Sequence, residues 1–293
     1  MKTKIHPKDV RVNSKLDPNL VEDVCVGNVL ATGSAYIARS AVLASGYPVT
    51  AAASIANRFC SSGLLAIQQI ASQILAGSIE IGIAVGAESM STNPDDGAPP
   101  ISAKCQAHPI AAQNLMPMGH TSEEVAGQFS ISRGEMDAFA AASVQKAERA
   151  QREGWTRDEI VPVAVTITDP KTGETREAVV SLDDGIRPGT TAEGLGKIRA
   201  AFPQWAPSNT TGGNASQITD GAAAVLLMKR SRAEELGQPI VAKFFGATVV
   251  GLEPRIMGIG PSYAIPKILE KAGLTKEDVD VFEINEAFAS MVS

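Results

Sequence analysis

The stretch Asn57-Arg58-Phe59-Cys60-Ser61-Ser62-Gly63 places one thiol at the junction between a predicted strand and a predicted helix. Residues 49–55 are small and β-branched over the length of a strand, and apolar residues recur at helical spacing through residues 64–75. The first turn of a helix leaves amide groups unpaired, and its dipole stabilises an anion. The pattern therefore predicts a nucleophilic thiolate at Cys60. The alternative is that Cys60 is a small apolar residue buried in a β-α turn, as most lone cysteines are.

Predicted strands and helices alternate on both sides of this turn. Residues 24–30 form a short apolar strand, residues 35–44 an alanine-rich helix, and residues 79–90 a largely apolar strand of the kind that helices cover on both faces. The order is βαβαβ. It predicts an α/β sheet between layers of helices, with the reactive residue at a strand end.

The character of the chain changes between residues 91 and 205, where prolines, glycines, methionines and charged helices replace the buried strands. Capping boxes beginning at Thr121 and Ser132 predict two helix starts, the second opening a long amphipathic helix over residues 134–152. Residues 161–182 have the pattern of a β-hairpin. We interpret this region as an inserted, partly exposed subdomain.

Small residues return after the insertion. Residues 210–216 form a turn rich in backbone donors, which leads into a predicted buried strand at residues 220–228. A strand at residues 240–250, a helix at residues 263–272 and a strand at residues 279–284 then follow. The arrangement of the first half thus begins again.

The composition is that of a globular protein and excludes several classes of partner. The 293 residues are 44% hydrophobic, carry a formal net charge of -6 and show no cluster of basic residues, so nucleic acid and anionic membranes are not expected partners. Three cysteines without metal-ligand spacing fit reduced thiols. No uninterrupted apolar run approaches the roughly 20 residues of a membrane helix, and no apolar segment follows the charged amino terminus. We expect an intracellular protein.

Four motifs occur in the order in which one enzyme family carries them. They are Asn57-Arg58-Phe59-Cys60-Ser61-Ser62-Gly63, then Gly213-Asn214-Ala215-Ser216 with Asp220-Gly221-Ala222-Ala223, then Met257-Gly258-Ile259-Gly260-Pro261, and finally Asn285-Glu286-Ala287-Phe288. Over about residues 18–293 the chain resembles a thiolase, an acetyl-CoA acyltransferase of the 3-ketoacyl-CoA thiolase type. Residues 256–266 and 282–290 look closest to the peroxisomal branch.

The resemblance implies an α/β protein with the thiolase fold, in which two βαβαβ halves and an inserted loop domain are layered α-β-α-β-α. In those terms we expect a tail at residues 1–18, an N-terminal half at residues 19–90 and 206–232, a CoA-binding loop domain at residues 91–205, and the start of a C-terminal half at residues 233–293.

The resemblance also implies a reaction, the cleavage of a 3-ketoacyl-CoA by CoA to acetyl-CoA and a shortened acyl-CoA, as in fatty acid β-oxidation. Cys60 would carry the acyl group as a thioester, and its own amide would serve one oxyanion site. Asn285 would hold a water at the second oxyanion site. Without the motif around it, Asn285 would be interpreted as a turn residue at the end of a strand. The resemblance implies no metal or redox cofactor, and coenzyme A would be a substrate.

Further residues are implied to contact the acyl-CoA. Ser216 would touch the pantetheine arm, and Arg187 would lie by the nucleotide end, where a guanidinium can meet phosphate. The walls near the thioester would be Met118, Met257, Ala287 and Phe288. The alternative is that the methionines are core residues and that Arg187 is a surface ion-pair partner.

The sequence departs from the family pattern after the last motif. Thiolases use a histidine in a Gly-His-Pro motif and a second cysteine in a Cys-x-Gly motif, both beyond the Asn-Glu-Ala-Phe motif. None of His6, His108 and His120 stands in such a motif, and pairing of the last two as metal ligands is disfavoured because no carboxylate or thiolate clusters with them. We therefore expect a chain shortened at both ends.

These departures leave an alternative function open, that of a catalytically inactive thiolase-like protein that binds CoA or lipid, or that associates with other subunits. The ketoacyl synthases share the architecture but use two histidines after the cysteine. The partners expected from the resemblance are acyl-CoA, CoA and a second subunit, as a homodimer or an assembly with a full-length subunit. The expected location is the peroxisome, with the mitochondrion and the cytoplasm as alternatives.

Overall fold

The computed structural model describes residues 16–169 and 171–293, which form two compact units. Unit 1 comprises the described chain up to Asp95 together with Asp158–Leu182 and Ile218–Phe245. Unit 2 comprises Asp96–Arg157, Asp183–Gln217 and Gly246–Ser293. His6 and most of the tail predicted at residues 1–18 lie outside the described residues. The predicted domain boundaries stay a prediction.

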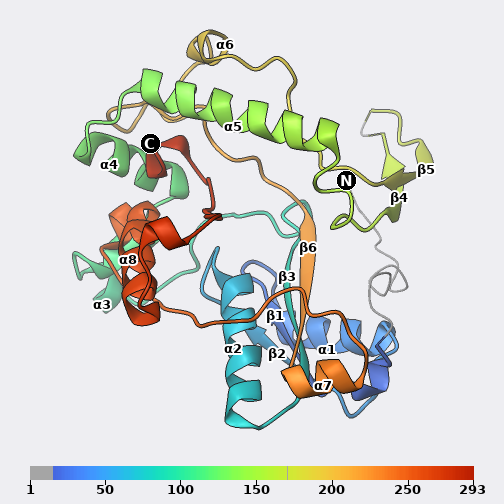
Figure 1. Ribbon diagram of the computed structural model, residues 1–293. Coiled ribbons are helices and arrows are strands. Elements are labelled where there is room, and N and C mark those ends of the chain that lie inside the picture. Colours follow the sequence, from blue (N-terminus) through green and yellow to red (C-terminus); the bar gives the residue numbers. More distant parts are fainter. Residues whose placement is uncertain (1–15, 170) are drawn as a thin grey trace. The chain divides into compact units, whose positions relative to one another are not determined.

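Unit 1 is built on a sheet with the strand order β2-β1-β3-β6 (Figure 1). Its strands are β1 (Asp23–Gly27), β2 (Ala52–Ala56), β3 (Ile81–Glu88) and β6 (Gly221–Met228). β1 runs parallel to both β2 and β3, with Val24 opposite Ala53 and Ile83, whereas β6 runs antiparallel to β3. The predicted βαβαβ alternation and the strand at residues 220–228 are confirmed. The predicted burial of this strand is wrong, because β6 lies at the edge of the sheet and its first five residues are exposed.

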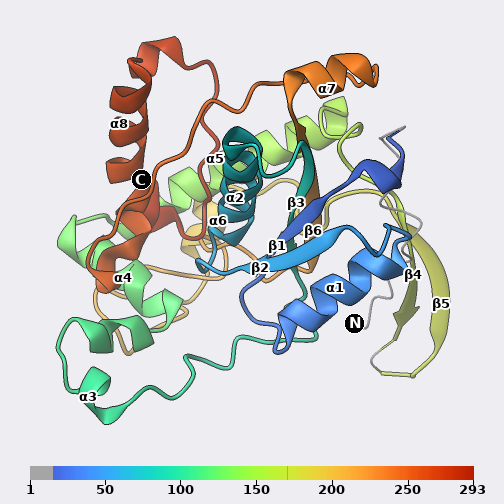
Figure 2. The same ribbon diagram turned by 90° about the horizontal axis from the view of Figure 1, so that it is seen from below.

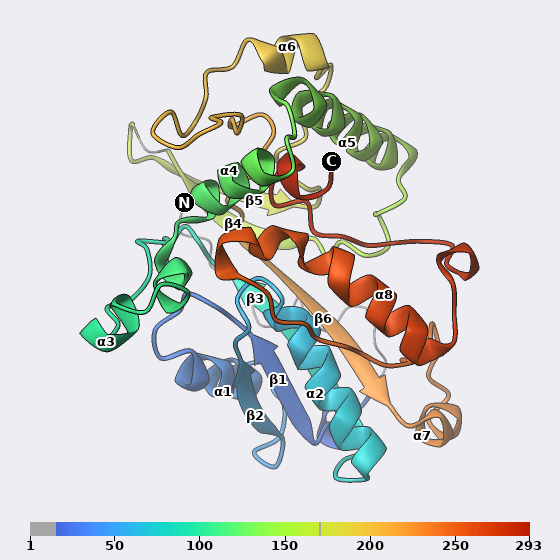
Figure 3. The same cartoon turned by 90° about the vertical axis from the view of Figure 1, so that its left-hand side faces the viewer.

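Helices cover both faces of this sheet because successive strand residues point to opposite sides. Val24 and Ile81 pack with Val42 of α1 (Ser34–Ala44) on one face. Cys25 and Ala84 pack with Ile70 of α2 (Ser62–Ala76) on the other. Figure 2 shows the two helices on opposite sides of the strands, and Figure 3 shows α2 lying along β1 and β3. The sheet is therefore the middle layer of unit 1.

α2 carries no charged residue, and the window Phe59–Ala76 is long and apolar enough to be a candidate membrane span by length and composition alone. The side chains of Ala66 and Ile70 are nevertheless fully buried against the sheet. Core helices of globular proteins meet the same compositional test. One face of α2 thus packs on the sheet, whereas Leu64 and Leu75 on the rest of the helix are 59% and 80% exposed.

The remaining elements of unit 1 are short. They are η2 (Pro18–Leu20), α7 (Arg230–Glu235) and the hairpin of β4 (Val163–Thr168) and β5 (Thr175–Val180). The hairpin confirms the pattern seen at residues 161–182.

Unit 2 is mainly helical. Its elements are α3 (Ala103–Gln106), η3 (Ala111–Leu115), α4 (Met118–Gln128), α5 (Arg133–Glu153), α6 (Ala192–Gly196), η4 (Pro254–Ile259), α8 (Gly260–Ala272), η5 (Lys276–Asp278) and η6 (Ala289–Met291). Ala126, Met136 and Ala289 form one small core, which joins α4, α5 and η6. Figure 1 accordingly shows the carboxyl-terminal segment beside α4 and α5.

One of the two predicted capping boxes is confirmed. Ser132 accepts a hydrogen bond from the amide of Glu135, whose carboxylate accepts the amide of Ser132, and Gly154 in the left-handed conformation ends α5. The box predicted at Thr121 is wrong, because α4 already begins at Met118. The Thr121 hydroxyl instead donates to the carbonyl of Met118 within the helix.

The strands predicted at residues 240–250 and 279–284 are also wrong. Both segments are irregular, and Val241 is 96% exposed. A strand needs a neighbour to pair its backbone amides and carbonyls, and the described sheets offer these segments no partner. The helix predicted at residues 263–272 is confirmed as α8, whose first turn begins earlier, at Gly260.

Candidate active site

Cys60 lies in the turn that connects β2 to α2 and is exposed to solvent. It comes two residues before the first residue of the helix, where the positive end of the helix dipole favours an anion. The interpretation of Cys60 as a buried apolar residue is therefore wrong for this structure. Cys105 is also exposed, whereas Cys25 is buried in the sheet.

The side chains of the motif fix the backbone of the turn. The buried hydroxyl of Ser62 accepts from the amide of Arg58 at 2.9 Å and donates to the carbonyl of Phe59 at 2.5 Å. Asn57 accepts from the amide of Phe59 at 3.0 Å. Phe59, directly before the thiol, has a φ of +48°, a conformation that only a well-held non-glycine residue keeps. The thiol is thus presented by a rigid turn.

Glu88 ties this turn to the ends of the neighbouring strands. Its carboxylate accepts from the side chain of Asn28 at 3.0 Å and from the amide of Val29 at 2.9 Å, just beyond β1. The carbonyl of Val29 in turn accepts from the side chain of Asn57 at 3.3 Å. The first residue of the predicted nucleophile motif is therefore anchored to the carboxyl edge of the sheet.

Glycines let the first turn of α2 sit directly on the strand ends. A Cβ atom added to Gly27, at the end of β1, would overlap the carbonyl of Ser62 and lie 2.6 Å from the amide nitrogen of Gly63. A Cβ atom added to Gly63 would lie 3.5 Å from the Cα atom of Gly86 in β3, an ordinary contact distance. The position of Cys60 relative to the sheet thus depends on Gly27 having no side chain.

Asp220 holds the same edge of the sheet together at the start of β6. Its carboxylate accepts from the amide of Ser91 at 2.9 Å and from the hydroxyls of Ser91 and Ser89. These hydrogen bonds, first that of the Ser91 hydroxyl, lower the pKa of Asp220 below its ordinary value. Asp220 belongs to one of the recognised motifs, and the structure gives it a structural contact rather than a reacting one.

Unit 2 brings three of the predicted acyl-CoA residues together. The amide of Ser216 donates to the carbonyl of Ala287 at 2.8 Å, and Ala215 forms an isolated antiparallel bridge with Phe288. The amide of Ala289 donates to the carbonyl of Asn214 at 2.9 Å. The motif that ends the insertion and the Asn-Glu-Ala-Phe motif are therefore one paired structure.

The two predicted methionines lie on neighbouring elements of unit 2. Met118 is the first residue of α4 and is 39% exposed, whereas Met257 is half-buried in η4, which packs against α4. Gly258, next to Met257, leaves no room for a Cβ atom against the side chain of Met291 of η6. The core interpretation does not fit Met118, and the predicted contacts of both methionines with substrate stay predictions.

Asn285 and Arg187 are exposed on irregular segments of unit 2. The guanidinium of Arg187 makes one long contact, 3.5 Å, to the carbonyl of Ile186. Among the described residues, Arg187 forms no ion pair, which disfavours its interpretation as an ion-pair partner. Cys60 belongs to unit 1 and these residues to unit 2. Their roles stay predictions.

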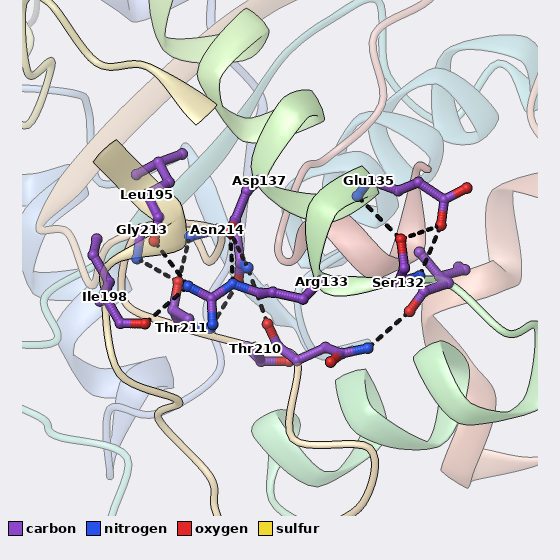
Figure 4. Close-up of polar contacts among 12 residues, drawn as sticks. Ser132, Arg133, Glu135, Asp137, Leu195, Ile198, Thr210, Thr211, Gly213 and Asn214 are labelled. Atoms are coloured by element: carbon purple, nitrogen blue, oxygen red, sulfur yellow. Dashed lines mark hydrogen bonds and ion pairs between the residues drawn. The ribbon is translucent and has the colours of Figure 1, made fainter. Parts of the chain in front are cut away.

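Two buried carboxylates of unit 2 were missed by sequence reasoning. Glu123 of α4 is fully buried, and Asp137 of α5 is 2% exposed. Figure 4 shows Asp137 between Arg133 and Asn214, with Asn214 reaching back to Thr211. The sequence does contain a signal for both residues, because each carboxylate stands among the apolar residues on the buried side of its helix. Glu123 was instead interpreted as part of the capping box that begins at Thr121.

The described part of the chain does not contain a recognisable metal site. No three His, Cys, Asp or Glu side chains converge there in a way that could hold a metal ion. His120 stacks on Trp205 with ring centroids 4.6 Å apart and lies 3.5 Å from Glu124. These contacts give His120 a packing role at the start of α4.

Family sequence models match nearly the whole chain. The thiolase N-terminal domain matches residues 7–231, and the thiolase C-terminal domain matches residues 238–292. The peroxisomal 3-ketoacyl-CoA thiolase of Yarrowia lipolytica is 53% identical over 279 residues, which cover 94% of this chain and 67% of that protein. Peroxisomal 3-ketoacyl-CoA thiolase A of Rattus norvegicus is 53% identical over 277 residues, which cover 94% of this chain and 63% of that protein.

The solved structures agree with the sequence comparison. The crystal structure of the dimeric peroxisomal thiolase of Saccharomyces cerevisiae matches with a TM-score of 0.85 and 46% identity, covering 94% of this chain and 68% of that one. The predicted resemblance and the predicted α/β thiolase fold are thereby confirmed, although the chain spans about two thirds of the length of these relatives. This chain belongs to the thiolase family.

Proposed function

We propose that this protein is an acyltransferase that cleaves a 3-ketoacyl-CoA with CoA, through an acyl thioester on Cys60. The observation that carries the proposal is the exposed thiol of Cys60 at the amino end of α2, in a chain of the thiolase family. A helix start of this kind stabilises a thiolate, which is the nucleophilic form of cysteine.

The reaction would proceed in two acyl transfers. The Cys60 thiolate attacks the C3 carbonyl of the 3-ketoacyl-CoA, and the C2–C3 bond breaks with its electron pair remaining on C2. Protonation of C2 gives acetyl-CoA and leaves the acyl group on sulfur. The thiolate of a second CoA then attacks this thioester, which releases the shortened acyl-CoA and restores the Cys60 thiolate. The order is ping-pong.

The paired loops of unit 2 would supply the acyl-CoA contacts. Ser216 would meet the pantetheine arm beside Ala287 and Phe288, and Met118 and Met257 would exclude water near the thioester. Arg187, whose guanidinium is exposed, would meet a phosphate of the nucleotide. Asn285 would hold a water as an oxyanion donor, an arrangement of which each donor commonly contributes about 3 kcal/mol.

The names of the relatives support a location and an assembly. The Yarrowia lipolytica and Rattus norvegicus relatives are named as peroxisomal, and the Saccharomyces cerevisiae structure is titled as dimeric. By likeness we propose a peroxisomal location and a homodimer for this protein, or an assembly with a full-length subunit. β-Oxidation of fatty acids is the corresponding process.

A second candidate is a catalytically inactive thiolase-like protein that binds CoA. The observation that favours it is His120, which stacks on Trp205 with ring centroids 4.6 Å apart and lies 3.5 Å from Glu124. These are the contacts of a packing residue rather than of a base.

Acetyl-CoA labelled in its acetyl group separates the two candidates. Mass spectrometry of the purified chain should find one acetyl group on the Cys60 peptide, removable by adding free CoA. The Cys60→Ser variant should carry no label, and Cys105→Ser, a matched control at another exposed cysteine, should be labelled like the unmodified chain. CoA binding without any acetylation of Cys60 would establish the second candidate instead.

A further inference from the structure

Two segments of unit 2 that carry predicted acyl-CoA residues are held together by few direct bonds. The loop 209–216 and the segment 285–290 share two backbone hydrogen bonds, from Ser216 to Ala287 and from Ala289 to Asn214. An isolated pairing of this length is marginally stable by itself, so the buried side chains that bond to these segments contribute to their geometry.

Glu123 of α4 holds the start of the loop. One of its carboxylate oxygens accepts the amide of Asn209 at 2.9 Å and the other accepts the amide of Thr210 at 2.7 Å. The Glu123 side chain is fully buried, and the donors to its carboxylate are these two backbone amides. A buried carboxylate is tolerated only where such donors satisfy it, so the loop and the helix determine each other.

Asp137 of α5 holds the other end of the same loop. Its carboxylate accepts from the guanidinium of Arg133 at 2.6 Å and from the side-chain amide of Asn214 at 2.9 Å, as Figure 4 shows. Asn214 then accepts the amide of Thr211 at 2.7 Å and donates to the carbonyl of Asn209 at 3.1 Å. Because Asp137 and Asn214 are both buried, water cannot replace these bonds.

Ser122, next to Glu123, extends the contact to the second segment. Its hydroxyl lies 2.8 Å from the hydroxyl of Thr210 and 2.8 Å from that of Ser290, and all three side chains are buried. α4 therefore touches both paired segments, while α5 reaches the loop from another side. Contacts with both helices therefore restrain the conformation of the loop 209–216.

We propose that Glu123 and Asp137 are positioning residues, which act through the loop 209–216 to set Ser216 against Ala287 for binding of the pantetheine arm of coenzyme A. The identity of the ligand, coenzyme A, rests on the proposed function, whereas the contacts of Glu123 and Asp137 with the loop do not. Neither carboxylate touches the substrate; each fixes backbone or side-chain groups that lead to the paired segments.

The proposal predicts what an isosteric amide would do at each site. In Glu123→Gln and Asp137→Asn, an NH2 group replaces one acceptor oxygen and faces a donor that is already in place. A buried donor is then left unpaired, and the loop opens to satisfy it. The cross-segment bonds of Ser216 and Ala289, which neither carboxylate makes, would loosen as a consequence.

Amide hydrogen exchange of the full chain measures this coupling without any ligand. In both variants the amides of Ser216 and Ala289 should exchange at least about 10-fold faster than in the unmodified chain. Glu124→Gln is the matched control, because Glu124 is the next residue of α4 and its carboxylate, which is 32% exposed, pairs with Arg255 rather than with the loop 209–216. Its exchange at Ser216 and Ala289 should stay within about twofold of the unmodified chain.

Coenzyme A binding by calorimetry gives the functional readout. The dissociation constant for CoA should rise at least about 10-fold in both carboxylate variants, while alkylation of Cys60 by iodoacetamide stays unchanged, because Cys60 belongs to unit 1. If the unmodified chain binds no CoA, the proposed function fails, and the exchange of Ser216 and Ala289 still decides the positioning role.

The proposal is overturned if folded Glu123→Gln and Asp137→Asn exchange Ser216 and Ala289 at the rate of the unmodified chain. It is equally overturned if exchange rises only at Asn209 and Thr210, because the carboxylate would then act locally. Should Glu123→Gln fail to fold, Glu123→Asp replaces it, and should Asp137→Asn fail to fold, Asp137→Glu replaces it. Each replacement keeps the charge but changes the reach of the carboxylate, and each should still accelerate exchange at Ser216 and Ala289.

Discussion

Gly27, the last residue of β1, lies against the carbonyl of Ser62, the first residue of α2, with no room for a Cβ atom between them. Gly27→Ala forces the strand end and the helix start apart. We expect the free energy of unfolding to fall by about 1–3 kcal/mol, as in other overpacked sites. Urea unfolding measures the loss, and the rate of Cys60 alkylation should change because the thiol moves with the helix start.

The control for Gly27→Ala is Gly86→Ala. Gly86 is the register partner of Gly27 on β3, but a Cβ atom there would meet Gly63 at an ordinary contact distance of 3.4 Å. Its free energy of unfolding should stay within about 1 kcal/mol of the unmodified chain. Equal destabilisation by the two substitutions would contradict the close contact of Gly27 with α2.

The three cysteines should differ sharply in reactivity. Burial raises the pKa of the Cys25 thiol, with the neighbouring Asp23 carboxylate adding to the effect and a hydrogen bond with Ser54 opposing it. Cys60 and Cys105 are exposed. Iodoacetamide should modify both in the folded chain, and Cys25 at least about 100-fold more slowly, because its reaction needs local opening. Peptide mass spectrometry assigns the sites, and rapid alkylation of Cys25 would show that the packing of α2 on the sheet is wrong.

Asp220 should make the free energy of unfolding depend on pH. Since hydrogen bonds from Ser91 and Ser89 lower its pKa in the folded state, the carboxylate adds stability above its ordinary value of 3.8, and this is lost as the pH falls through the lower folded value. Asp220→Asn should cost about 1 kcal/mol or less at pH 7, because the site is exposed. Urea unfolding over a pH series should show the difference shrinking below pH 3.8, whereas a constant difference would argue against the carboxylate.

The capping box of α5 gives a separate stability prediction. Ser132→Ala removes the acceptor for the amide of Glu135, and we expect a loss of about 1 kcal/mol in the free energy of unfolding. Ser132→Asp restores a cap and should recover most of that loss. Thermal unfolding followed by circular dichroism compares the variants; a fully stable Ser132→Ala would mean that packing alone sets the start of α5.

Arg187 should contribute charge to nucleotide binding. Its guanidinium is exposed, so Arg187→Ala removes a cation without leaving a buried group unpaired. If Arg187 meets a phosphate of CoA, the dissociation constant should rise about 10-fold, the effect of one charge-assisted hydrogen bond. Arg176→Ala, at an exposed position of β5, is the control. Identical CoA affinities of the two variants would remove Arg187 from the site.

Local sequence patterns predicted the elements whose geometry is decided locally. α5 has a complete capping box at its start and a glycine at its end, and α2 has an uninterrupted apolar face that begins at a Ser-Ser-Gly turn. Recognition of four ordered motifs supplied the family. The same patterns could not supply β-pairing, which depends on neighbours: the apolar segments 240–250 and 279–284 have strand composition but no partner among the described strands.

The candidate site shows the same division. Cys60 is exposed, as a nucleophile must be, but the pairing of Ser216 with Ala287 was not predicted, because it joins two segments about 70 positions apart. The burial of Glu123 could not be predicted from the motifs, because Thr121 and Glu124 form a plausible capping box in the sequence. The helix in fact begins at Met118, and Glu123 faces the interior. Whether a carboxylate faces solvent or a buried amide depends on a loop more than 80 positions away, which no local pattern reports.

The antiparallel pairing of β6 with β3 has a consequence for synthesis of the protein. Glu88 pairs with Gly221, so the edge of β3 remains uncovered while the ribosome makes the whole intervening segment. An open apolar edge on a nascent chain is a template for aggregation. Chaperone demand should therefore be greatest in the interval between emergence of β3 and emergence of β6.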